Sequence, residues 1–144
     1  MDVGGLYKIA DENNIKIHEI GFDEVVSVSI PKNIAIDKDK IHNNIEMVDV
    51  LSHELGHCVT NSFYNSNNIL DVFEKQEYRA DMWKMSQLLP LSSYIEAIAR
   101  GITDVRYLAY EYDLCYDFAE KAAEYYNDNF DIEKLVAEYK SNRF

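Results

Sequence analysis

The sequence is poor in cysteine, proline and glycine, with two, two and five of them in 144 residues. Cys58 and Cys115 form neither a C-x-x-C motif nor the framework of a disulfide-rich secreted domain. Because proline, glycine and serine are never clustered, no stretch has the composition of a flexible linker. We therefore expect one domain over residues 1–144, stabilised by an apolar core.

Long hydrophobic runs are missing as well. No apolar stretch approaches the roughly 20 residues that a membrane-spanning helix needs. The first residues, MDVGGLYKIADENN, lack the basic segment and apolar stretch that are typical of a signal peptide. Together with the absence of a disulfide framework, this predicts a cytoplasmic protein without membrane association.

Basic residues are scarce: 14 lysines and arginines stand against 26 aspartates and glutamates, for a net charge of −12. Contacts with nucleic-acid phosphates need clustered lysine and arginine, so direct nucleic-acid binding is disfavoured. A solvated acidic surface is the simplest interpretation of this charge. The alternative is attraction to a basic partner protein.

The hydrophobic pattern predicts an α+β fold with a small N-terminal sheet. Helical spacing over residues 3–13 is followed by strand-like segments at 15–20, 25–30 and 33–36. Pro31 cannot donate a ladder hydrogen bond, so it belongs at a strand end or edge. The pattern after these strands is mostly helical, and hydrophobic residues make up 47% of the chain, which is enough for a core.

A long helix is expected after Asn43, which forms a capping-box pattern with Glu46. Asn61 and Ser62 can end this helix. Four residues spaced by three or four positions should face the core: Val48, Leu51, Leu55 and Val59.

The same helix carries HELGH at residues 53–57. Positions four apart stack on one helix face, so His53 and His57 can present two imidazoles to one metal ion. Glu54 would project beside the metal, where it can take a proton from the attacking water and pass it to the leaving amine. Gly56 costs a helix about 1 kcal/mol, so we expect another backbone or a substrate to approach it closely. Two solvent-facing histidines on an ordinary amphipathic helix are the alternative.

A third ligand is available on the next predicted helix, in EYRAD at residues 77–81. Glu77 borders the core-facing side, where a carboxylate is costly unless it is paired or bound to a metal. Asp81 lies one turn later on the same face and can accept the free N–H of a ligand histidine. Glu74 is a rival ligand, although a capping role already explains it. An exposed pair of acidic residues is the alternative for Glu77 and Asp81.

Other residues have simpler interpretations. His18 in a strand and His42 in a turn are expected to be structural, and Cys58 to be a small core residue. Tyr64 or another tyrosine could stabilise an oxyanion. Residues 104–126 can be drawn as a helix-turn-helix, but their acidic second helix would repel phosphate, which favours a packing or docking element.

HELGH, followed by EYRADMWKMSQLLP at residues 77–90, resembles the ImmA/IrrE family of zinc metallopeptidases. The family pattern is H-E-x-x-H, then E-x-x-A-[ND]-x-[FW]-A and a leucine-rich end with proline. The resemblance extends to GITDVRYLAYEYDL at 101–114, so it covers most of the chain. Lys84 departs from it, because a small alanine is usual at this position.

The resemblance implies a single zincin-like domain over residues 1–144, with its small N-terminal sheet packed against the active-site helix. It implies Zn²⁺ as the cofactor, although Mn or Co could occupy the same ligands. The residues matching the motif are the metal ligands His53, His57 and Glu77, the catalytic glutamate Glu54, and the supporting residue Asp81.

Members of this family commonly act in phages and other bacterial mobile elements as anti-repressors. The resemblance therefore implies an endopeptidase that cleaves a protein substrate, a basic helix-turn-helix repressor. The alternative is a metal-stabilised regulatory protein without catalytic activity, which docks on a repressor or toxin partner.

Overall fold

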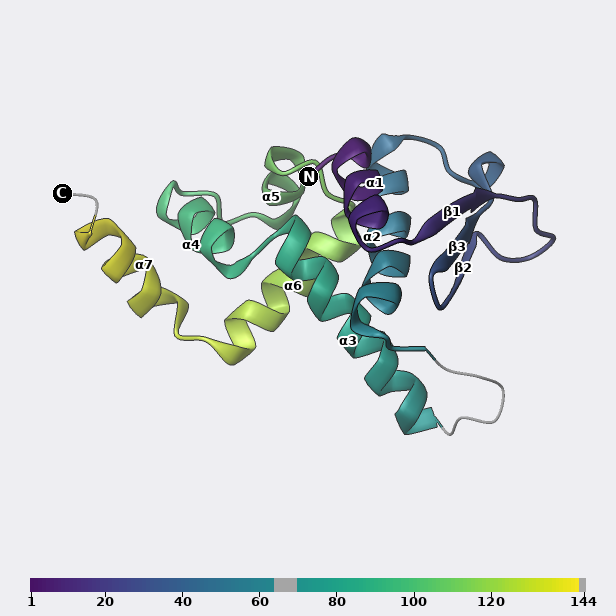
Figure 1. The fold of residues 1–144 in the computed structure, drawn as a ribbon. Coiled ribbons are helices and arrows are strands. Elements are labelled where there is room, and N and C mark those ends of the chain that lie inside the picture. The colour runs from purple at the N-terminus through teal and green to yellow at the C-terminus, as the bar shows by residue number, and fades with distance from the viewer. Residues whose placement is uncertain (64–69, 143–144) are drawn as a thin grey trace. The chain divides into compact units, whose positions relative to one another are not determined.

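The computed structural model describes residues 1–63 and 70–142, except for the side chain of Asp71. The chain divides into two compact units, residues 1–87 and 88–144 (Figure 1). The expectation of one domain over residues 1–144 stays a prediction.

The first unit contains a mixed sheet of three short strands, β1 (Lys16–Glu19), β2 (Ser27–Ile30) and β3 (Asn33–Ile36). The order is β1-β3-β2, with β1 parallel and β2 antiparallel to the central β3 (Figure 1). Pro31 directly follows β2, as predicted, so the missing N–H falls in the turn to β3. All three strands lie within the predicted segments, and β2 is left at one edge of the sheet.

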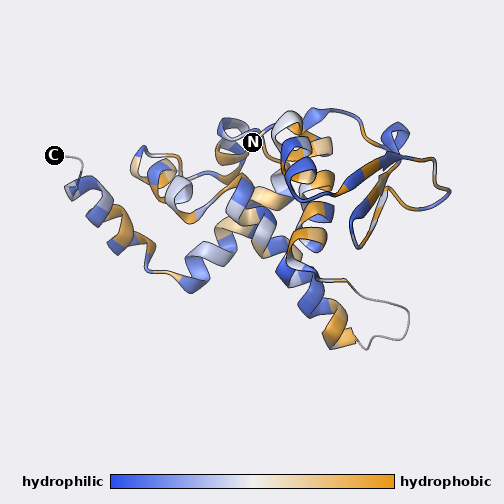
Figure 2. Ribbon diagram, viewed as in Figure 1, coloured by the Kyte–Doolittle hydropathy of each residue, from blue (hydrophilic) through white to orange (hydrophobic). Residues whose placement is uncertain are grey.

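One face of the sheet packs against helices α1 (Val3–Glu12) and α2 (Asn44–Thr60). Both helices carry hydrophobic as well as hydrophilic residues (Figure 2), as expected of helices with one face in a core. The side chains at the centre of this core are fully or almost fully buried: Leu6, Ala10, Ile34, Ile36, Leu51 and Leu55. The core therefore fixes the position of α2, the helix that carries HELGH, against the sheet.

The caps and the core-facing residues of α2 agree only in part with those predicted from the sequence. Asn43 caps the helix by accepting a hydrogen bond from the Glu46 N–H at 2.9 Å. The Glu46 carboxylate, however, accepts the N–H of His42 at 2.8 Å, so the reciprocal bond of a capping box is replaced by one to the preceding residue. The prediction that Val59 faces the core is wrong, because 36% of its surface is exposed. The helix ends at Thr60 and is capped by Asn61, which adopts the left-handed conformation.

Lys40 stabilises the loop that leads into β2. It closes the short 3-10 helix η1 (Lys38–Lys40) and donates hydrogen bonds to the carbonyl oxygens of Phe22 and Val25. It also forms an ion pair of 3.0 Å with the Asp37 carboxylate, which accepts the Phe22 N–H at 3.0 Å. The hydrogen bond from the Phe22 N–H lowers the pKa of Asp37 most, and the hydrogen bond from Lys40 lowers it further.

Helix α3 (Leu70–Leu88) supplies the EYRAD segment. The sequence also predicts a loop at residues 65–68 and a capping pair of Asp71 with Glu74, but residues 64–69 and the side chain of Asp71 lie outside the described part of the structure. Lys84, where the resemblance leads one to expect alanine, is only 6% exposed and forms an ion pair of 2.6 Å with Asp49 of α2. A charge pair between the two helices therefore occupies the position where the family pattern has alanine.

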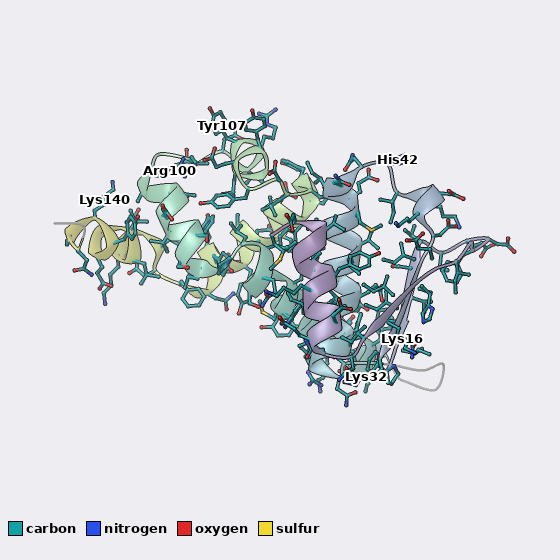
Figure 3. All side chains as sticks on the ribbon, turned by 45° about the horizontal axis from the view of Figure 1, so that its top comes forward. Lys16, Lys32, His42, Arg100, Tyr107 and Lys140 are labelled. Atoms are coloured by element: carbon teal, nitrogen blue, oxygen red, sulfur yellow. The ribbon has the colours of Figure 1, made fainter. Side chains whose placement is uncertain are left out.

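The second unit is helical in its described residues, with α4 (Leu91–Ala99), α5 (Val105–Glu111), α6 (Tyr116–Asn129) and α7 (Ile132–Ser141). In it α4 packs on α7 and α5 on α6. The Tyr126 hydroxyl donates to the Leu89 carbonyl oxygen at 2.6 Å, and Arg100 pairs with Glu111 at 2.8 Å (Arg100 is labelled in Figure 3).

The α+β class and the mostly helical C-terminal half are therefore confirmed. Across residues 1–63 and 70–142, no helix has both the length and the apolar character needed to cross a bilayer.

Candidate metal centre

The two histidines of HELGH lie side by side on α2, as their spacing predicts. Their ring centroids are 4.8 Å apart with the rings perpendicular, and their Nε2 atoms are 3.2 Å apart. His57 is 4% exposed, whereas the His53 side chain is 25% exposed. The pair is thus anchored in the core at one end and reaches the surface at the other, which contradicts the alternative of two solvent-facing side chains.

Glu77 of α3 completes a cluster with these histidines. Its Oε1 lies 3.0 Å from Nε2 of His57 and its Oε2 lies 3.1 Å from Nε2 of His53. One candidate ligand atom from each of the three residues lies within 4.8 Å of the others. The rival, Glu74, is exposed one turn earlier on the same helix. Of the two glutamates, Glu77 is the one that the fold brings to the histidines.

The Nδ1 atoms of both histidines lie next to hydrogen-bond acceptors, which favours the tautomer with the proton on Nδ1. Nδ1 of His57 donates to the backbone carbonyl oxygen of Ser62 at 2.6 Å, because a carbonyl can only accept. Nδ1 of His53 lies 3.2 Å from Oδ1 of Asp81, again an acceptor when the carboxylate is ionised. With the proton on Nδ1, a ring in its neutral form directs an Nε2 lone pair toward the Glu77 carboxylate.

This donor set fits a metal ion. Lone pairs on two nitrogens and a carboxylate repel one another at about 3 Å unless a proton or a metal cation lies between them. Ligands at about 2.0–2.1 Å from a tetrahedral zinc ion are roughly 3.3 Å apart, close to the separations of 3.0–3.2 Å found here. The residues His53, His57 and Glu77 therefore form a possible metal site, and its chemistry suits zinc.

The charges around the site favour a cation. Burial by itself lowers the pKa of His53, but the hydrogen bond to Asp81 and the charge of Glu77 outweigh it, and the net change is upward. The same carboxylates that stabilise a protonated imidazole would stabilise a metal ion at this position.

Gly56 allows α3 to approach α2 at the site. A Cβ atom on Gly56 would lie 2.5 Å from the carbonyl oxygen of Ala80, closer than any real contact. The expected close approach is therefore made by a backbone of the protein itself. Because Ala80 stands between Glu77 and Asp81, this contact brings both carboxylates to the histidines.

Two side chains of α3 hold the segment that follows α2. Arg79 donates to the Thr60 carbonyl oxygen at 2.7 Å, and Gln76 donates to that of Phe63 at 2.8 Å. Between these two points lies Ser62, whose carbonyl oxygen binds His57. The second helix thus supplies a carboxylate for the cluster and also fixes the chain that orients one of its imidazoles.

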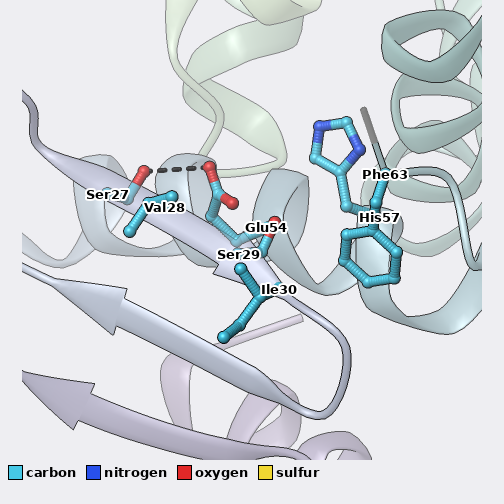
Figure 4. Close-up of a pocket in the computed structure, with 7 residues that line it drawn as sticks. All are labelled: Ser27, Val28, Ser29, Ile30, Glu54, His57 and Phe63. Atoms are coloured by element: carbon cyan, nitrogen blue, oxygen red, sulfur yellow. Dashed lines mark hydrogen bonds between the residues drawn. The ribbon is translucent and has the colours of Figure 1, made fainter. Parts of the chain in front are cut away.

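A cleft of about 190 Å³ lies beside the cluster, between β2 and α2. Figure 4 shows the residues that line it, Ser27, Val28, Ser29, Ile30, Glu54, His57 and Phe63. Glu54, the predicted catalytic residue, is 8% exposed and accepts a hydrogen bond from the Ser27 hydroxyl at 3.0 Å. The glutamate of HELGH and one of its histidines therefore share a cavity large enough for a side chain or several water molecules.

Sequence reasoning did not find three of the residues that support this site: Ser27, Ser62 and Lys84. Ser27 and Lys84 act across 27 and 35 positions of the chain, on Glu54 and Asp49. Ser62 acts through its backbone, for which residue type gives little signal. The asparagine at position 61 was the available signal, because asparagine often ends a helix in the left-handed conformation. Here it does so, and the chain turns back toward His57.

The remaining predicted residues lie elsewhere. His18 binds Asn33 on the sheet at 3.0 Å, and His42 is exposed before α2 (Figure 3). Cys58 is half-buried, its Sγ lying 3.6 Å from the Ile30 carbonyl oxygen. Tyr64 lies outside the described residues.

Comparison of the chain with protein-family models, with curated proteins and with solved structures finds no significant match. The geometry of the cluster on α2 and α3 is therefore the main basis for a proposal about the reaction.

Proposed function

We propose that this protein is a zinc-dependent endopeptidase with a zincin-like active site. The observation that carries the proposal is the convergence of His53, His57 and Glu77 next to a cleft that Glu54 lines. Metal-assisted hydrolysis needs three protein ligands and a separate acid–base group at one site. These four side chains meet that requirement, whereas a purely structural metal site has no use for the glutamate.

Each residue has a distinct role in this proposal. His53, His57 and Glu77 would hold the metal, and Asp81 would fix the His53 ring by accepting its Nδ1–H. When bound, zinc supplies Lewis acidity, which polarises a carbonyl group and lowers the pKa of water. The Glu54 carboxylate accepts a proton from the attacking water and then delivers it to the leaving amine.

The sheet supports a polypeptide as the substrate. β2 is an edge strand of the described sheet and forms one wall of the cleft. The outer backbone groups of an edge strand can pair with an extended chain, which is a common way of binding peptides. Phe63 adds an apolar surface that a substrate side chain can contact.

The identity of the substrate is proposed from the resemblance to the ImmA/IrrE family. On that basis the substrate is a basic helix-turn-helix repressor of a phage or mobile element, and the protein acts as an anti-repressor in the cytoplasm. The net charge of −12 supports a basic partner and disfavours binding to DNA itself.

Metal analysis and proteolysis of purified variants test the proposal. Glu54→Gln should retain stoichiometric zinc and lose about 10²–10⁴-fold in cleavage rate, because it removes the acid–base group. His57→Ala and Glu77→Gln should bind zinc more weakly, by more than the roughly 10- to 100-fold expected for loss of a supporting residue such as Asp81. Glu74→Gln is the matched control for Glu77→Gln, since this exposed glutamate lies one turn away on α3.

Two substrates should be used, a quenched-fluorescent peptide library and any helix-turn-helix repressor that is encoded next to the gene for this protein. Cleavage of either by the wild type, but not by Glu54→Gln, supports an endopeptidase. Binding of zinc and of the repressor without any fragments would instead favour the non-catalytic regulator. Failure of the wild type to bind zinc would overturn both functions.

A further inference from the structure

The Glu54 side chain extends from α2, and its carboxylate is held by a hydrogen bond from the sheet. Its Oε1 accepts a hydrogen bond of 3.0 Å from the Ser27 hydroxyl across the cleft (Figure 4). At 8% exposure, this carboxylate has little access to solvent and depends on protein donors for its orientation. A donor that occupies one oxygen leaves the other available for proton transfer.

The backbone of Ser27 is fixed by the pairing of β2 with the central strand β3. In the ladder it pairs with Ile36 of β3, and the preceding carbonyl oxygen, that of Val26, accepts the Asp37 N–H at 2.8 Å. Asp37 is in turn held by Lys40, which also binds the loop before β2. The hydroxyl is thus presented from a rigid position and not from a mobile loop.

The alternation of the strand directs Ser27 inward. Val28 and Ile30 are 45% and 59% exposed, so they lie on the outer face of the sheet. Ser27 and Ser29 therefore point to the opposite face, the one that packs on α2. Both serines line the cleft, yet among the residues drawn in Figure 4 the bond to Glu54 comes from Ser27.

From this geometry we infer that Ser27 is a positioning residue for the acid–base glutamate. Its hydroxyl holds Oε1 of Glu54, which orients the carboxylate so that its second oxygen can receive a proton in the cleft. The inference rests on the proposed peptidase function, and it adds a residue of β2 that lies outside the metal-binding motif.

Crystal structures test the inference without any measurement of activity. Zinc-loaded wild type and the variants Ser27→Ala, Ser29→Ala and Ser27→Thr should be compared. The Glu54 carboxylate should keep its position in the wild type, in Ser29→Ala and in Ser27→Thr, which retains a hydroxyl on a strand. In Ser27→Ala it should rotate or become disordered. An unmoved, well-ordered carboxylate in Ser27→Ala would overturn the inference.

Steady-state kinetics on the best-cleaved peptide of the fluorescent library give a second readout. Ser27→Ala should lower kcat by about 10- to 100-fold, the loss expected when a reacting group is misplaced, while KM changes little and zinc content stays the same. Ser27→Thr should recover most of kcat. An unchanged kcat in Ser27→Ala would contradict the inference and leave the peptidase intact. If the wild type cleaves nothing, the proposed function fails and the crystallographic comparison alone decides the role of Ser27.

Discussion

Gly56 of α2 faces the backbone of Ala80 of α3, with room for a hydrogen atom but not for a methyl group. A Cβ on Gly56 would lie 2.5 Å from the Ala80 carbonyl oxygen and 3.0 Å from its Cα. In sequence, Gly56 stands between the two histidines and Ala80 between the two carboxylates. The spacing of the helices at this point therefore controls the geometry of the candidate metal centre.

Gly56→Ala should weaken both the fold and zinc binding. Overpacking typically costs about 1–3 kcal/mol, which outweighs the roughly 1 kcal/mol that alanine gains over glycine in a helix. Urea unfolding and a zinc titration measure the two effects. Gly4→Ala in α1 is the control, because its Cβ would make an ordinary contact of 3.6 Å. Unchanged zinc affinity in Gly56→Ala would show that the helix spacing does not control the site.

The ion pair of Lys84 with Asp49 should contribute to the packing of α3 on α2. Lys84→Met retains the apolar stem but leaves the Asp49 carboxylate without this cation, which should cost about 1–3 kcal/mol. Replacing both residues, as Lys84→Met with Asp49→Leu, should recover part of the loss, because apolar pairs often substitute well for charge pairs. Urea unfolding of the single and double variants gives the coupling energy. A coupling below about 0.5 kcal/mol would mean that the two side chains act independently.

Zinc should stabilise the protein against heat. A ligand that binds only the folded state adds about 2.7 kcal/mol when its free concentration is about 100 times Kd. Differential scanning calorimetry should show Tm rising with zinc and falling again with EDTA in the wild type and in Glu74→Gln. The shift should be much smaller in Glu77→Gln. Equal shifts in the two glutamate variants would remove Glu77 from the ligand set.

Asp37 should make the stability of the first unit dependent on pH in the acid range. The Phe22 N–H and Lys40 lower its pKa below the usual 3.8, so the folded state favours the charged carboxylate. Its contribution is present above the unfolded pKa and is lost as the pH falls through the lower folded value. The difference in unfolding free energy between the wild type and Asp37→Asn should therefore shrink below about pH 4.

Asp39→Asn is the matched control, because Asp39 is an exposed carboxylate of η1, the short helix that Asp37 caps. Its unfolding free energy at neutral pH should stay close to that of the wild type, since this side chain is exposed. A gap between the wild type and Asp37→Asn that stays constant down to acid pH would indicate a loss of packing and not of charge.

Local patterns in the sequence determined much of the candidate site. The spacing of four between His53 and His57 places them on one face of any helix, whatever surrounds it. Gly56 signalled a close approach because glycine is unfavourable within a helix, and Glu77 was selected because a carboxylate near the core needs a partner. Strand alternation and Pro31 likewise located the sheet.

Tertiary structure decided which distant groups meet. No local pattern could show that Ser27 reaches Glu54, because a serine in a strand has many possible partners and its choice depends on how β2 packs on α2. Lys84 makes the same point, because its burial depends on the ion pair with Asp49 of α2. The exposure of Val59 likewise could not be read from its helical spacing. The sequence by itself determines periodicity, and therefore which residues share a helix or strand face. Long-range packing determines what each face contacts, because those contacts depend on the whole chain and not on its neighbours in sequence.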